Sequence, residues 1–187
     1  MTDLSLETRS GLPDEIAYLR SSFPQPGWRA HANFGELSAF WLQVHEHLRG
    51  QGGALSQATS AYRQRRVDPG QFRQYFVPTL SQFLQHLNGH HQIEDRFYFP
   101  KFRALDPRMP AGFDLLESDH QLIHEALLAT AETANRFLQS AVDEERRAAD
   151  TYAAAADRLL ALLTRHLADE EDLIIPAILQ HGEQGVR

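Results

Sequence analysis

The longest stretch without a helix-breaking residue places the strongest constraint on the fold. From Phe113 to Ile175 the sequence contains neither proline nor glycine. One helix of that length would measure about 95 Å at 1.5 Å per residue, which is too long for a compact domain of this size. Residues Ser140–Asp143 resemble a capping box, and we therefore predict that they separate two helices.

Two further helices are indicated upstream. Apolar residues recur at intervals of three and four between Ala30 and Arg49, and a cluster of glycines at positions 50, 52 and 53 is expected to end that helix. Asp68–Gly70 marks the start of a second helix, which we expect to end near Leu105. Amphipathic helices joined by mostly short connections predict an all-α, up-down-up-down four-helix bundle over residues 30–182. Residues 1–29, interrupted by proline and glycine, predict an irregular arm that can include a short helix within residues 13–23.

Composition excludes several classes of protein. The 187 residues include no cysteine, which excludes disulfides, thiolate zinc sites, iron–sulfur clusters and cysteine nucleophiles. A formal net charge of −7 argues against a nucleic-acid partner. No apolar run approaches the roughly 20 residues of a membrane span, and the N-terminus lacks the layout of a signal peptide. We therefore expect a soluble, cytoplasmic protein with neither a nucleic-acid nor a membrane partner.

A repeat preserves residues of the kind that bind metals. Residues 90–100 read HHQIEDRFYFP and residues 166–176 read HLADEEDLIIP, so both follow the pattern H-x3-E-[DE]-x4-P. His45 lies 45 residues before His90, and His120 lies 46 residues before His166. The chain therefore resembles two helical hairpins, each supplying a histidine followed by an H-x3-E pair.

Helical spacing places these histidines and glutamates in columns that should be apolar. The three columns are Leu80, Phe83, Leu87, His90, Glu94, Phe97; Phe113, Leu116, His120, His124, Leu127, Ala131; and Leu159, Leu163, His166, Glu170, Leu173, Ala177. Burying an unpaired carboxylate costs several kcal/mol, and a metal cation removes that cost. The alternative is a set of ordinary core histidines with buried salt bridges, but no lysine or arginine shares these columns near the histidines.

The neighbouring residues carry expectations of their own. The run Phe97–Phe99 is expected in the core, and Pro100 and Pro176 are expected to kink or end their helices. Two further sets are expected outside the site. Surface or supporting positions are predicted for His31, His47, His86, His91 and His181, and solvated charges for Asp95, Asp169 and Glu171.

On these motifs the sequence resembles the hemerythrin-like HHE cation-binding domain family, from about Trp28 to Gln180. The residues that carry the resemblance are His45, His90-x3-Glu94, Asp119-His120-x3-His124 and His166-x3-Glu170. The resemblance implies two non-haem iron ions, oxo- or hydroxo-bridged. It implies one iron held by His120, His124 and His166, the other by His45 and His90, with Glu94 and Glu170 bridging both.

For the ligand from the first helix, His47 and His31 are alternatives to His45. We prefer His45 because it alone fits the repeat spacing and stacks with Trp41. The position in this helix that matches His124 is Arg49, which cannot bind a metal. One iron would therefore keep an open coordination position for a small oxidant.

Imidazole and carboxylate donors without thiolate favour iron, with zinc and manganese as alternatives. We expect a protein that binds or senses dioxygen, nitric oxide or redox state, without assigning any catalytic residue. Two other classes stay open: a di-iron enzyme, such as a peroxidase, oxidase or nitric oxide reductase, and a protein for iron handling or repair.

Overall fold

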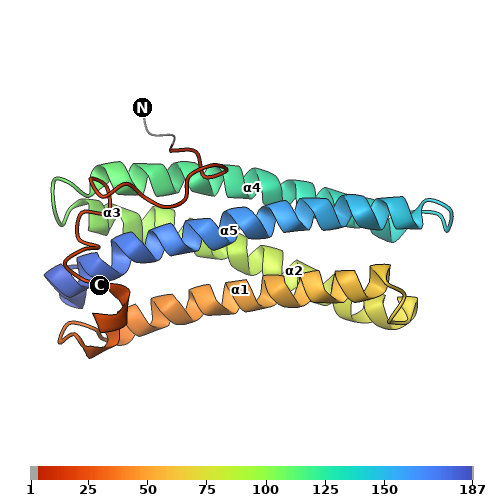
Figure 1. Cartoon of the computed structure of the whole chain (residues 1–187), viewed down its shortest axis with the longest axis horizontal. Helices are drawn as coiled ribbons and strands as arrows, with labels where there is room; N and C mark the ends of the chain where they lie inside the picture. Colours follow the sequence, from red (N-terminus) through yellow and green to blue (C-terminus); the bar gives the residue numbers. More distant parts are fainter. Residues whose placement is uncertain (1–3, 187) are drawn as a thin grey trace. The chain divides into compact units, whose positions relative to one another are not determined.

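The structure, a computed structural model, describes residues 4–186 and confirms an all-α fold. Four long helices pack as a bundle (Figure 1): α1 (Glu36–Arg63), α2 (Pro69–Ile93), α4 (Pro110–Gln139) and α5 (Glu145–His181). Between α2 and α4 lie a π-helix, η2 (Glu94–Tyr98), and the short helix α3 (Phe99–Arg103). Two 3-10 helices, η1 (Gln25–Ala30) and η3 (Glu183–Gly185), flank the bundle in sequence.

The predicted break between the last two long helices is confirmed, because α4 ends at Gln139 and α5 begins at Glu145. Pro176 does not end α5, which continues to His181. Over residues 4–186, no helix is both long enough and apolar enough to cross a membrane.

The chain divides into two compact units, and every long helix contributes a segment to each. The first unit comprises Met1–Glu46, His90–His120 and Thr164–Arg187, and the second comprises His47–Gly89 and Gln121–Leu163. The first unit has a core that includes Trp41, Phe102, Phe113 and Ile174, all of which are buried. Every residue of the candidate site described below belongs to this first unit.

The glycines of α1 do not end the helix, contrary to the sequence prediction. The helix runs on through Gly50, Gly52 and Gly53 to Arg63. A Cβ atom at Gly52 would collide with the Leu160 side chain of α5 and lie 3.6 Å from the Phe83 ring of α2. Glycine at this position therefore permits the close packing of helices within the second unit, which outweighs its low helix propensity.

The π-helix changes which residues face the core after α2. The N–H of Phe99 donates to the carbonyl of Glu94, five residues earlier, so one turn contains an extra residue. Glu94 and Phe99 are buried, whereas the Phe97 side chain is 61% exposed. The prediction that Phe97 continues the core column is wrong, because the extra residue rotates it outward.

The N-terminal arm packs onto the first unit. Residues 4–35 form turns and η1, and the short helix considered for residues 13–23 is not formed. Leu12, Ala17 and Trp28 are buried in the core of this unit. Arg20 pairs with Asp172 of α5, with Nη1 and Oδ2 3.1 Å apart. The arm is therefore an ordered part of the first unit.

Candidate metal centre

Histidines and glutamates from all four long helices and from η2 meet inside the first unit. They form two groups of donors, and within each group the donor atoms lie within 4.8 Å of one another. The first group is His91, His120 and His166, and the second is His45, His90, Glu94 and Glu170. All are buried except His90, whose side chain is 10% exposed.

Both glutamates face histidines of the two groups. Glu94 Oε1 lies 3.0 Å from His90 Nε2, and Glu94 Oε2 lies 3.7 Å from His120 Nε2. Glu170 Oε2 lies 3.6 Å from His45 Nε2 and 3.4 Å from His166 Nε2. Each carboxylate is thus placed as a bridge between the groups would be.

Many of these buried polar atoms have no hydrogen-bond partner within residues 4–186. They are Nε2 of His45, His90 and His91, Nδ1 of His166, both carboxylate oxygens of Glu94, and Oε2 of Glu170. One such atom costs about 1–3 kcal/mol, so a cluster of them calls for a counter-charge. His120 Nε2 and His166 Nε2 lie 3.0 Å apart. Two imidazole nitrogens bound to one ion at about 2.1 Å and at right angles would have a similar separation, about 3.0 Å. The donors therefore fit metal ions.

Comparison with known families agrees with this geometry. Residues 36–184 match the hemerythrin HHE cation binding domain. The chain belongs to this family. No curated protein and no solved structure matches it. The matched part of the HHE domain begins with α1, so the N-terminal arm lies outside it.

Carboxylates on the far side of the histidine rings orient the donors of the HHE domain. Asp95 Oδ1 lies 2.7 Å from His120 Nδ1, and Glu171 Oε1 lies 2.9 Å from His45 Nδ1. A carboxylate at Nδ1 fixes the tautomer that leaves Nε2 free to bind a metal.

These supporting residues were not identified from the sequence, which predicted that Asp95, Asp169 and Glu171 are solvated charges. Asp169 and Glu171 are in fact buried, and the half-buried Asp95 is engaged by His120. The repeat contained the signal, because Asp95 and Glu171 both directly follow the glutamate of H-x3-E. Each supports a histidine of the other hairpin, and that cross-pairing is not visible in the sequence.

An indole also holds one of the carboxylates. Trp41 Nε1 donates to Glu170 Oε1 over 2.9 Å, leaving Oε2 directed at the histidines. The Trp41 ring in turn contacts Tyr98 edge-on, with ring centroids 4.9 Å apart. One oxygen of Glu170 is thereby fixed while the other remains available.

The pKa values of most of these donors are shifted, because the side chains are buried and lie close to one another. Burial lowers the pKa of His90 to about 3 and also lowers the pKa values of His91 and His120. Burial and the neighbouring Glu170 raise the pKa of Glu94 well above its usual range. Burial opposes ionisation of His166 too, yet contacts with Asp119 and Glu170 raise its pKa to about 9. For Glu170, burial is outweighed by His45 and His166, and its pKa is lowered. Three of the imidazoles are therefore neutral near pH 7, the form that binds metals.

Of the residues predicted to bind iron, the structure brings together His45, His90, Glu94, His120, His166 and Glu170. It does not place His124 with them. The His124 side chain is exposed and belongs to the second unit, whereas the adjacent Ile123 is buried. The predicted column continues four residues beyond His120, whereas the next buried residue of α4 is Ile123, three residues beyond it.

His91 joins His120 and His166 instead, although it was expected at the surface or in a supporting position. Its ring is buried and stacks on that of His120 at a centroid distance of 4.0 Å. The adjacent pair His90-His91 could have indicated this position in the sequence. A regular helix directs neighbouring side chains about 100° apart, so only one of the two was expected to face inward.

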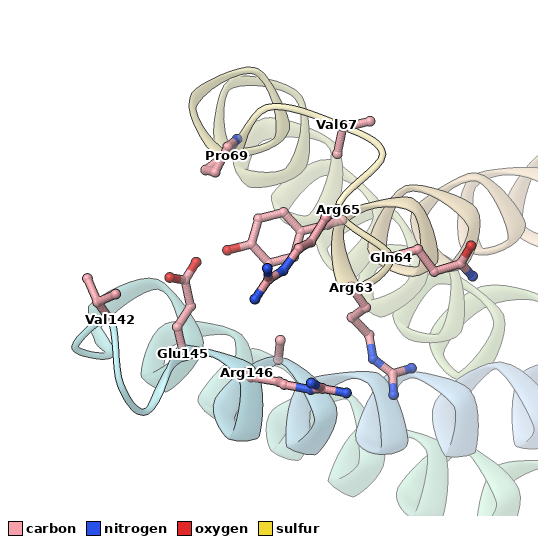
Figure 2. A pocket seen from close by; sticks show the side chains of 10 residues that line it. Arg63, Gln64, Arg65, Val67, Pro69, Val142, Glu145 and Arg146 are labelled. Atoms are coloured by element: carbon pink, nitrogen blue, oxygen red, sulfur yellow. The ribbon is translucent and has the colours of Figure 1, made fainter.

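A surface hollow elsewhere in the HHE domain has a different character. It lies within the second unit and is lined by three arginines, by Gln64 and Glu145, and by apolar side chains such as Val67 and Val142 (Figure 2). No histidine lines it. Its chemistry therefore differs from that of the buried donor groups.

Proposed function

We propose that this HHE domain holds two iron ions. One would be bound by His91, His120 and His166 and the other by His45 and His90, with Glu94 and Glu170 bridging both. This assignment replaces His124, which the family resemblance implied, with His91. The observation that carries the proposal is the convergence of buried, unsatisfied donor atoms on two carboxylates that each face both groups.

The donor set favours iron and limits its chemistry. Imidazole suits iron, copper and zinc, and the absence of cysteine removes thiolate chemistry. Bound iron would supply the capacity to bind and reduce small oxidants. The protein supplies a water-poor surrounding, because Phe99, whose ring stacks on that of His120, and Leu167, which directly follows His166, are both buried.

The two ions would differ in their number of histidines. The group that contains His91 offers three, and the group that contains His45 offers two. The second ion is therefore the one with an open position for a ligand. We infer that the site binds or senses dioxygen, nitric oxide or redox state, because a buried position suits a small diatomic ligand.

The first experiment measures iron content and optical absorption of protein produced with added iron. The wild type is compared with a His166→Ala/Glu170→Ala double variant. The matched control is His181→Ala, which removes an exposed histidine from the same helix. We expect two irons per chain and near-ultraviolet absorption of a bridged ferric pair in the wild type and control, and loss of both in the double variant. A wild type without bound iron would contradict the proposal.

The same iron-loaded protein separates sensing from the two other classes. A reversible spectral change with dioxygen or nitric oxide, without product, is the outcome expected here. Sustained consumption of peroxide or nitric oxide would instead indicate an enzyme. Rapid transfer of iron to a competing protein would indicate iron handling.

A further inference from the structure

The N-terminal arm places a buried arginine beside the candidate metal centre. Arg9 is 5% exposed and lies outside the part of the chain that matches the family. It forms a two-pronged ion pair with Asp119 of α4, and its Nε donates to Asp169 Oδ2 of α5 over 2.7 Å. Its Nη1 also donates to the Leu4 carbonyl over 2.8 Å, which ties the guanidinium to the arm itself. In Figure 1 the arm passes α4 and α5 in the first unit.

The partners of Arg9 lead directly to the proposed ligands. Asp119 immediately precedes His120, and Asp169 immediately precedes Glu170. Asp119 Oδ2, which pairs with Arg9, also lies 3.5 Å from His166 Nδ1. The contacts therefore run from Arg9 through Asp119 to the back of the His166 ring.

Simple attachment of the arm does not require this arrangement. Removing charged groups from water is costly, and buried ion pairs often stabilise a fold no more than apolar residues would. Arg20 shows how the same arm is attached at lower cost, by pairing with Asp14 and Asp172 while remaining 33% exposed. The burial of Arg9 against two carboxylates thus calls for a role beyond attachment.

We propose that Arg9 is a positioning residue of the metal centre. It fixes Asp119, and Asp119 orients His166 through Nδ1, as carboxylates commonly do for metal-bound histidines. Docking of the arm and retention of the ion bound by His166 are then thermodynamically linked. This step rests on the proposed function, since it requires that His166 binds a metal. Linkage is reciprocal, so loss of the metal loosens the arm by the same factor by which release of the arm weakens metal binding.

The test compares Arg9→Met with Arg20→Met, which removes a second arginine anchor of the same arm, one that pairs with Asp14 and Asp172. Iron loss to a chelator is followed by absorption. We expect Arg9→Met to lose half of its iron about tenfold faster, as for other residues that orient metal ligands. Arg20→Met should leave that rate unchanged. Equal rates in the two variants would overturn the inference.

A second variant guards against a simple loss of folding. Arg9→Met leaves two carboxylates buried without their cation, so Arg9→Met/Asp169→Asn removes one of these charges while keeping Asp119. If this variant unfolds in urea at the same midpoint as Arg20→Met when metal-free, yet still loses iron faster, positioning is supported. If its iron loss matches that of the wild type, Arg9 serves the fold alone.

Hydrogen exchange of the arm provides a readout that does not depend on iron loss. In the wild type, chelation of the metal should speed amide exchange within residues 5–12, and cobalt(II) added in place of iron should restore protection. The Arg9→Met/Asp169→Asn variant should show no such dependence. Metal-independent exchange in an iron-binding wild type would refute the linkage, whereas a wild type that binds neither metal would refute the proposed function itself.

Discussion

The assignment of His91 as a ligand, in place of His124, leads to the most decisive prediction. His91→Ala removes a buried imidazole that belongs to a three-histidine group, whereas His124→Ala removes an exposed one from the second unit. Both substitutions delete the same side chain from a helix. Any difference in metal binding therefore reports the position of the residue.

The expected loss of stability on removal of one metal site follows from mass action. A site in contact with free metal at 100 times its dissociation constant stabilises the folded state by about 2.7 kcal/mol. Each kcal/mol shifts the melting temperature of a chain of this length by about 2–4 °C, so loss of one site should lower it by about 5–11 °C. His124→Ala, as an exposed substitution, should change stability by no more than about 0.5 kcal/mol.

The assay measures iron per chain and thermal unfolding of both variants, each with and without iron. The metal-free comparison removes the packing cost of deleting the buried ring. We expect His91→Ala to retain one iron per chain and to lose most of one increment of iron-dependent stabilisation. If His124→Ala loses iron while His91→Ala keeps both ions, the ligand assignment proposed above is refuted.

Two further predictions test the fold and the support of the ligands. Gly52→Ala should destabilise the protein by about 1–3 kcal/mol in urea unfolding, because its methyl group would meet Leu160. Gly50→Ala is its matched control: nothing lies near its added Cβ, and it should stabilise α1 by about 0.5–1 kcal/mol; equal effects would exclude close packing as the reason. Glu171→Gln keeps a hydrogen-bond acceptor for His45 but removes the charge, so metal affinity in a chelator competition should fall about tenfold. Unchanged affinity would show that the charge of Glu171 is not required.

Much of the site could be predicted because its residue types recur in sequence. The pattern H-x3-E occurs twice, and all of its members belong to the donor groups: His166 to the first, and His90, Glu94 and Glu170 to the second. A histidine three or four residues from an apolar core position lies on the same face of the helix as that position, because the helix repeats about every 3.6 residues. Such histidines can therefore be recognised as buried from the sequence. The same regularity could not distinguish His124 from Ile123, since both lie within one turn of His120.

The sequence by itself determined that this chain forms four long helices and that its interior would hold histidines and glutamates. Those properties depend on helix periodicity and breaking residues, which act within a few residues of one another. Only the tertiary structure decided the contacts between distant segments: the cross-support of His45 by Glu171, the approach of Leu160 to Gly52, and the burial of Arg9 against Asp119. The physical reason is that such contacts depend on how helices are rotated against one another. One extra residue in a π-turn, as at Phe97, changes that rotation without a local signal.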